Sequence, residues 1–284
     1  MHPYPPLRRR ALARPWGGIF FFVLALHLLP LACASQGVGL APPRIELVLA
    51  PGERVTRKFI AFTTEGRAIP IQPDLFDYTQ DGLGNIHFLP PGHTPYSLFP
   101  YLQVALDPFD VQKGKNHPIP FTVTAPENGE GSYWIALSLT TQPLPRKEKG
   151  ELAVRAVQRI RILAGIYVTV AGTARPRAEL VSPRWLKRNS ASGSTQTYFQ
   201  VEIKNRGNTY LRLTPRLFFK DKTGKEIFST MANELLILRG EDVRVAIPFP
   251  EAPEEAILGG VEFLSTGPPA VRLTAPLYAE KPLE

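Results

Sequence analysis

Side chains that could perform catalysis or hold a metal are spread thinly along this 284-residue sequence. The five histidines form no H-x-x-H or H-E-x-x-H pair and have no clustered carboxylates beside them, which argues against a zinc site; they are His2, His27, His87, His93 and His117. A G-x-S-x-G turn around a nucleophilic serine and a phosphate-binding P-loop are also missing. We therefore expect no enzymatic activity, no cofactor, no metal and no small-molecule substrate.

Three aspartates, Asp74, Asp77 and Asp81, lie close together in the first half of the chain. Their spacing does not fit the twelve-residue loop that holds calcium in proteins. Asp81 begins the segment DGLGN, whose glycines are typical of a tight turn. A turn-forming role is therefore the better interpretation of these carboxylates.

The clearest pattern in the sequence is an alternation over residues 152–167, LAVRAVQRIRILAGIY. Even positions are apolar except for Gln158, and three odd positions are basic: Leu152, Val154, Ala156, Ile160 and Ile162 against Arg155, Arg159 and Arg161. A period of two over this length predicts a long β-strand with one apolar face and one basic face. The apolar face either fills the protein's own core or is offered to a partner, and the pattern alone leaves both open.

The first 34 residues have the features of an export signal. Four arginines at positions 8, 9, 10 and 14 precede an apolar run over residues 19–31, and Ala32-Cys33-Ala34 supplies an A-x-A cleavage site. We predict cleavage after Ala34, which places the mature protein in the periplasm or cell envelope. Lipid attachment at Cys33 is the alternative, because Leu31-Ala32-Cys33 partly matches a lipobox, although Pro30 departs from that pattern.

Cleavage would change both the cysteine count and the net charge. Cys33 is the only cysteine of the chain, so the mature protein would have no disulfide and no thiol nucleophile. Removing four of the 33 basic residues and none of the 25 acidic ones lowers the net charge from +8 to +4. So mild a charge on an exported protein argues against nucleic acid as a partner.

Turn residues and short β-branched or aromatic runs dominate the rest of the chain. It has 30 prolines and 22 glycines, and no stretch of ten residues shows a 3.6-residue apolar period. Short strands recur on both sides of a small-residue segment at 170–177 at the spacing of a β-sandwich. We predict an all-β protein with two immunoglobulin-like sandwiches in tandem: a signal peptide at 1–34 and domains at 35–172 and 173–284.

Three local expectations concern strand pairing and strand ends. Residues 44–49 are expected to pair with the next strand, 54–63, as in a meander. The polar residues 187–195, KRNSASGST, are expected to form a flexible stretch. The segment 221–225, DKTGK, is expected to be the turn of a hairpin.

The order of short motifs in the first half resembles the periplasmic pilus-assembly chaperones, the PapD-like family of two-domain immunoglobulin-fold proteins. The matching segments, in order, are Arg44-Ile45-Glu46, Pro51-Gly52-Glu53, Asp77-Tyr78-Thr79-Gln80-Asp81-Gly82, Asp107-Pro108-Phe109-Asp110-Val111 with Gly114, Pro126 with Gly131-Ser132-Tyr133, and the alternating strand from Leu152. The resemblance covers almost all of the first domain, while the second matches as a sandwich that follows a linker.

That resemblance implies a mechanism for the strand at 152–162. Members of the family insert the last strand of their first domain into a pilin fold that lacks a strand, which is a form of β-augmentation. Leu152, Val154 and Ala156 fall where the family places its donor side chains, although Ala156 is smaller than usual. Arg44 and Arg161 match the basic pair that grips the subunit's terminal carboxylate, with arginine at 161 where lysine is usual. The implied partners are protein subunits of a pilus or surface structure, and an outer-membrane usher.

A second interpretation needs no inserted strand. The Pro-Gly-Glu turn at 51–53 and the later Gly259-Gly260-Val261 are similar to features of two-domain, peptidoglycan-associated proteins of Gram-positive surface complexes. This interpretation predicts a non-enzymatic structural or adhesive envelope protein whose strand at 152–162 is fully covered. Lipidation of Cys33 would favour this interpretation, because a chaperone that shuttles its clients gains less from a membrane anchor.

Overall fold

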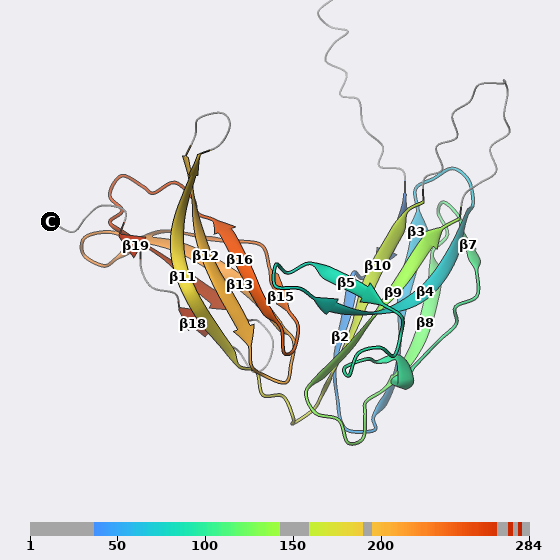
Figure 1. Cartoon of the computed structure of the whole chain (residues 1–284). Helices are drawn as coiled ribbons and strands as arrows, with labels where there is room; N and C mark the ends of the chain where they lie inside the picture. The colour runs from blue at the N-terminus through green and yellow to red at the C-terminus, as the bar shows by residue number, and fades with distance from the viewer. Residues whose placement is uncertain (1–36, 143–158, 190–194, 266–271, 275–277, 280–284) are drawn as a thin grey trace, which may run out of the picture. The chain divides into compact units, whose positions relative to one another are not determined.

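The computed structural model describes residues 37–142, 159–189, 195–265, 272–274 and 278–279 (Figure 1). In these ranges the chain forms strands and turns, with a short 3₁₀ helix at Phe99–Tyr101 and no α-helix. The strands all belong to one compact unit, Gly37–Glu284. The all-β prediction is therefore confirmed, whereas the predicted signal peptide and Leu152, Val154 and Ala156 lie outside the described residues.

Strands β1 to β10 form a first sandwich of two sheets. The four-stranded sheet has the order β1 (Val38–Ala41), β3 (Arg54–Thr63), β8 (His117–Thr124) and β6 (Leu102–Val104). The six-stranded sheet has the order β2 (Arg44–Leu49), β10 (Arg161–Val170), β9 (Ser132–Thr141), β4 (Ile69–Gln80) and β5 (Ile86–Leu89), and β7 (Phe109–Val111) also pairs with β4.

The core of the first sandwich is filled from the inner faces of both sheets. Phe59 of β3 and Phe121 of β8 stack with their ring centroids 5.4 Å apart. They pack in one cluster with buried residues of the other sheet, which include Ile71, Ile135 and Ile166. Alternate residues of a strand face the same way, so the apolar rows of these strands meet between the sheets and hold them together.

The central strand β9 is buried on both of its faces. Ile135, Leu137 and Leu139 face the sandwich core, as their alternation predicts. Trp134, on the opposite face, is also buried and joins a second cluster with Tyr78 and Tyr167. The outer face of the six-stranded sheet is therefore partly covered, and the residues beside this cluster become candidates for a functional site.

Strands β11 to β19 form a second sandwich. Its three-stranded sheet has the order β11 (Ala178–Asn189), β12 (Thr195–Asn205) and β16 (Asp242–Pro248). The other sheet has the order β14 (Glu226–Met231), β13 (Leu211–Lys220), β17 (Leu258–Leu264) and β18 (Arg272–Thr274), while β15 (Leu235–Ile237) pairs with β13 and β19 (Tyr278–Ala279) with β17. Its core is rich in buried phenylalanines: Phe199, Phe219, Phe249 and Phe263.

The first sandwich ends with β10 at Val170, and the second begins with β11 at Ala178. Across the described ranges, no ladder joins a strand of one sandwich to a strand of the other. The arrangement of two sandwiches in tandem is therefore confirmed. The exact boundary between residues 172 and 173 stays a prediction, and it falls in this connecting segment.

The expectation that residues 44–49 pair with 54–63 is wrong. β1 pairs with β3, but β2 runs parallel to β10 in the other sheet, with Arg44 opposite Gly165 and Ile45 opposite Ile166; Figure 1 shows β2 beside β10. Pro42 and Pro43 separate β1 from β2, and prolines have no N–H for a ladder. The chain uses this interruption to pass from one sheet to the other.

The expectation of a flexible stretch at 187–195 is wrong at both of its ends. β11 continues to Asn189 and β12 begins at Thr195, and these two residues are paired opposite each other. Strand pairing uses backbone groups, so polar side chains at exposed positions do not interrupt it. The guanidinium of Arg188 also lies 5.4 Å from the ring centroid of Tyr198, which supports the paired ends.

Candidate functional site

Strand β10 has an unpaired edge at its beginning. Its ladder with β9 starts at Arg161 opposite Thr140, whereas its ladder with β2 starts four residues later, at Gly165 opposite Arg44. Among the described strands, residues 161–164 are thus paired on one side only. Free N–H and C=O groups along a strand edge can accept another strand. This edge begins five positions after Ala156, the last of the predicted donor residues.

The apolar row of the sequence pattern continues into the core row of β10. Ile162 is half-buried and packs against the core, and Ala164, Ile166 and Val168 are buried in it. Leu163, on the other face, is 36% exposed. Because side chains alternate strictly along a strand, a strand that ran on from 152 without a bulge would keep Leu152, Val154 and Ala156 in phase with the core row.

Arg161 lies on the outer face of the six-stranded sheet. Its Nε donates a hydrogen bond to Oγ1 of Thr140 at 3.3 Å. Its guanidinium lies 5.2 Å from the ring centroid of Phe76, which is a favourable cation–π distance. Arg161 is thus exposed beside the unpaired edge, where it could contact an added strand.

Arg44, at the start of β2, lies in an ion cluster away from Arg161. Its Nε is 3.0 Å from Oε1 of Glu46, and its Nη1 is 3.2 Å from Oε1 of Glu234. In register, Arg44 stands four positions along β10 from Arg161, roughly 13 Å at the rise of a strand. The described contacts therefore do not bring the two predicted carboxylate-binding arginines together.

The sequence reasoning missed the arginine that does lie beside Arg44. Arg212 of β13 contacts the same two carboxylates, with its Nε 2.5 Å from Oε1 of Glu46 and its Nη1 3.1 Å from Oε1 of Glu234. Arg212 and Glu46 are 166 positions apart. The alternating segment LRLTPRLFFK indicates only a polar-facing arginine in a strand, so no local signal could have found this contact.

Two tyrosine rings pack against the guanidinium of Arg212. Its guanidinium lies 4.8 Å from the ring centroid of Tyr167 and 5.5 Å from that of Tyr210. Burial and the carboxylate of Glu46 raise the pKa of Tyr210 above its usual value. Burial alone would lower the pKa of Arg212, but Tyr167 and the two glutamates raise it. The cluster therefore keeps the guanidinium of Arg212 charged beside two aromatic rings.

The three neighbouring aspartates have separate structural tasks. Asp77 is fully buried, accepts a hydrogen bond from the hydroxyl of Ser97 at 2.6 Å, and accepts another from the backbone N–H of Thr94 at 2.9 Å. Asp81 forms a turn, as predicted. The turn-forming interpretation is wrong for Asp74 and Asp77, because both lie within strand β4, where the side chain of Asp74 is exposed. Across the described part of the chain, no group of three or more His, Cys, Asp or Glu side chains is placed to hold a metal ion.

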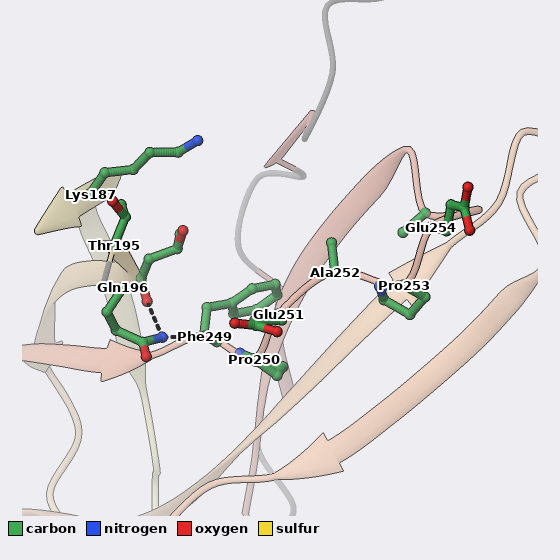
Figure 2. Close-up of a pocket in the computed structure, with 11 residues that line it drawn as sticks. Lys187, Thr195, Gln196, Phe249, Pro250, Glu251, Ala252, Pro253 and Glu254 are labelled. Carbon is green, nitrogen blue, oxygen red and sulfur yellow. Dashed lines mark hydrogen bonds between the residues drawn. The ribbon is translucent and has the colours of Figure 1, made fainter. Parts of the chain in front are cut away.

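A hollow of about 330 Å³ opens at one end of the second sandwich (Figure 2). Its side chains include Lys187, Gln196 and Glu251, and Figure 2 shows Gln196 directed at the backbone beside Phe249. The amide of Gln196 donates to the carbonyl of Phe249 at 2.6 Å and to that of Thr197 at 3.2 Å. This amide is therefore used to tie β12 to the chain after β16.

No family model and no curated protein matches the sequence. Solved structures of fimbrial chaperones are similar in fold. The chaperone DraB from E. coli matches with 9% identity and a TM-score of 0.43, over 85% of this chain and 98% of that one. A chain of the SafA pilin–SafB chaperone complex from Salmonella enterica matches with 9% identity and a TM-score of 0.44, over 84% and 97%. A chain of the CsuC–CsuE chaperone–tip subunit complex from Acinetobacter baumannii matches with 14% identity and a TM-score of 0.43, over 84% and 97%.

The described residues include no helix long and apolar enough to cross a membrane.

Proposed function

We propose that the protein is an exported assembly chaperone that binds subunits of a pilus or other surface structure by lending them the strand at 152–162. The observation that carries this proposal is the unpaired edge of β10 at residues 161–164. The order of motifs that resembles the PapD-like family supports it independently. The export signal predicted at 1–34 fits a chaperone that works in the periplasm, with an outer-membrane usher as a further partner.

The physical task of such a strand is to complete another fold. A subunit that lacks one strand exposes an apolar groove and unpaired backbone groups, which favour aggregation. A donated strand pairs with those backbone groups whatever the sequence, and its alternating apolar side chains fill the groove in one register. We propose that Leu152, Val154 and Ala156 supply that row; in the sequence they share the even numbering of the core residues Ala164, Ile166 and Val168 of β10.

Arg161 and Arg44 would contact different parts of the partner. Arg161 is exposed beside the open edge of β10, so it would contact the strand that pairs there. Arg44 lies further along, in a cluster of carboxylates, so it would bind a negatively charged group of the partner. We propose that this group is the carboxylate of the subunit's last residue.

The test uses two double variants that place two aspartates on opposite faces of the predicted strand. Leu152→Asp with Val154→Asp places two charges in the donor row, while Ala153→Asp with Val157→Asp places the same charges on the opposite face. Burying an apolar side chain contributes about 1.5–3 kcal/mol, so we expect the first variant to bind its subunits at least about a hundredfold more weakly. Complexes purified from the native envelope are identified by mass spectrometry, and subunit binding is then measured with purified components.

The opposite-face variant is the control and should retain its complexes. Thermal melts of both variants should match that of the unmodified protein. If the donor-row variant folds normally and keeps every complex, strand donation is excluded. A structural or adhesive envelope protein would then be the better assignment.

A further inference from the structure

A serine with an unfavourable backbone conformation lies in a bulge of the second sandwich. Ser182 of β11 has a φ of +52°, and it is the only residue other than glycine with a positive φ in the described ranges. The ladder of β11 with β12 shifts register between Val181 and Arg184, so two residues of β11 face one residue of β12 there. Bulges redirect side chains beside functional sites, and strained residues gather at sites that bind ligands. The bulge therefore marks this part of the sheet as a candidate ligand site.

A hollow of about 230 Å³ lies over this bulge. All three strands of the sheet line it, through Ser182, Arg184, Gln200, Val201, Glu202 and Arg244. Arg184 of β11 is opposite Gln200 of β12. Arg244 of β16 is opposite Glu202, two positions further along β12. The two arginines therefore stand at diagonal corners of the hollow, and both are exposed. Since neighbouring strands lie about 4.8 Å apart, both guanidinium groups can reach a ligand bound over β12.

Hydrogen-bond donors outnumber acceptors in this lining. Nη2 of Arg184 donates to Oε1 of Gln200 at 3.3 Å, and the NH₂ group of that amide is left as a further donor. Within the described ranges, neither arginine of the hollow forms an ion pair. Glu202 is the one acidic side chain of the lining, and Nζ of Lys204 lies 3.6 Å from its carboxylate. The hollow therefore carries an excess of positive charge that the protein's own carboxylates do not neutralise.

We propose that this hollow binds the phosphate group of an ester, with the guanidinium groups of Arg184 and Arg244 on its two sides and the hydroxyl of Ser182 as a third donor. A planar carboxylate presents both of its oxygens in one direction, which suits a single arginine, whereas a tetrahedral phosphate directs its oxygens to several sides. Arginines that approach from two different strands therefore fit a phosphate better. This assignment does not depend on strand donation.

The first arm of the test titrates the protein with glycerol 3-phosphate, against sodium chloride at equal ionic strength, and follows the arginine Nε–H signals by NMR. We expect the signals of Arg184 and Arg244 to shift with glycerol 3-phosphate and not with chloride. Arg184→Gln and Arg244→Gln should each weaken binding at least about tenfold, because each removes a hydrogen bond between charged groups. Sodium acetate should need about tenfold higher concentrations than glycerol 3-phosphate, because a carboxylate meets only one of the two arginines.

Arg188→Gln is the matched control for the arginine variants. Arg188 lies on the same strand four positions after Arg184, so it is on the same face of the sheet. Its guanidinium lies over the ring of Tyr198, outside the lining of the hollow. The variant loses the same charge as Arg184→Gln and should keep the response to glycerol 3-phosphate.

Ser182→Gly tests the contribution of the bulge. Glycine adopts a positive φ readily, so the fold should be kept. The hydroxyl is lost, and binding of glycerol 3-phosphate should weaken about fivefold, as expected for one hydrogen bond.

The second arm determines whether the phosphate belongs to a lipid headgroup. The protein is sedimented with vesicles of phosphatidylglycerol, and vesicles of phosphatidylcholine are the control. Sedimentation with phosphatidylglycerol that is lost in Arg184→Gln and kept in Arg188→Gln would assign the site to a headgroup. A response to glycerol 3-phosphate alone would assign it to a soluble ester.

Two results would overturn the proposal. One is the absence of a response at Arg184 and Arg244 in both arms. The other is equal weakening by Arg184→Gln and Arg188→Gln, because binding would then reflect the general charge of the sheet and not the hollow. Neither arm involves a pilus subunit, so this proposal and strand donation can fail or succeed independently.

Discussion

The same five-residue turn is built twice, once in each sandwich, and it is used differently each time. Asp81 closes the hairpin of β4 and β5, and Asp221 closes the hairpin of β13 and β14. In both, the aspartate Oδ1 accepts hydrogen bonds from the backbone N–H groups two and four positions later: 2.9 and 2.9 Å in the first turn, 2.8 and 3.1 Å in the second. Both have a glycine three positions after the aspartate, with φ of +87° at Gly84 and +81° at Gly224.

The surroundings of the two turns differ. The carbonyl of Gly82 in the first turn accepts a hydrogen bond at 2.8 Å from the backbone N–H of Arg244, on the free edge of β16. Gln80, just before that turn, donates to the carbonyl of Leu236 at 2.8 Å and accepts from the N–H of Leu238 at 3.1 Å. In contrast, every residue of β14, which follows the second turn, is exposed.

Local sequence therefore specifies the geometry of the turn, whereas the tertiary fold determines which residues the turn contacts. An aspartate followed by a glycine at the third position satisfies the hydrogen bonds of the turn in either hairpin. Docking of the first turn depends on residues more than 150 positions away, as with Gln80 and Leu236. Paired substitutions at equivalent positions of the two hairpins can separate these two contributions.

The largest difference in stability between variants of the two hairpins is expected at the residue before each aspartate. Gln80→Ala would leave the half-buried carbonyl of Leu236 and the buried N–H of Leu238 without their partner, which should lower the free energy of unfolding by about 3 kcal/mol. Lys220→Ala, at the equivalent position, removes a contact with the ring of Phe218 and an attraction to the exposed carboxylate of Glu226, and should cost less than about 1 kcal/mol. Urea denaturation of both variants measures the difference. Equal losses would show that docking of the first hairpin contributes nothing to stability.

A smaller difference in stability is expected for substitutions at the two turn glycines, Gly84 and Gly224. An L-residue at positive φ costs about 1 kcal/mol, so Gly224→Ala should lose about that much, since a Cβ there would meet nothing within 4 Å. Gly84→Ala carries the same cost and also places its Cβ 3.2 Å from Cγ1 of Val243. We expect a total loss of about 2 kcal/mol at Gly84, measured in the same denaturation series. If Gly224→Ala proves the more damaging, the two turns are not equivalent in backbone strain.

The smallest difference is expected in the acid titration of the two aspartates. Hydrogen bonds from the side chains of Asn85 and His87 hold the pKa of Asp81 well below its usual range, while the hydroxyl of Thr223 lowers the pKa of Asp221. A pKa that is lower in the folded state means that each carboxylate stabilises the fold above the unfolded pKa of about 4, and that this contribution is lost as the pH falls. Carboxyl ¹³C titration should show Asp81 protonating at lower pH than Asp221. His87→Ala should raise the pKa of Asp81, and an unchanged value would exclude the imidazole as a cause.

Much of the fold could be predicted from the sequence because strands and turns are local features. The alternation at 132–140 marks β9, and the DGLGN and DKTGK segments mark their turns. The parallel pairing of β2 with β10 could not be predicted, because two prolines show only that a ladder is interrupted and not where the chain goes next. Likewise, the charges of Arg44 and Glu46 are visible in the sequence, but Arg212 and Glu234 join them only through the tertiary fold.

The parallel pairing of β2 and β10 has a consequence for the order in which the chain can fold. Ile45 and Ile166 face each other across this ladder although 121 positions separate them. Contacts of such long sequence separation form slowly, because a large loop must close before any pairing stabilises it. During synthesis from the N-terminus, β2 emerges long before β10. The six-stranded sheet of the first sandwich can therefore close only after nearly the whole length of that sandwich is available.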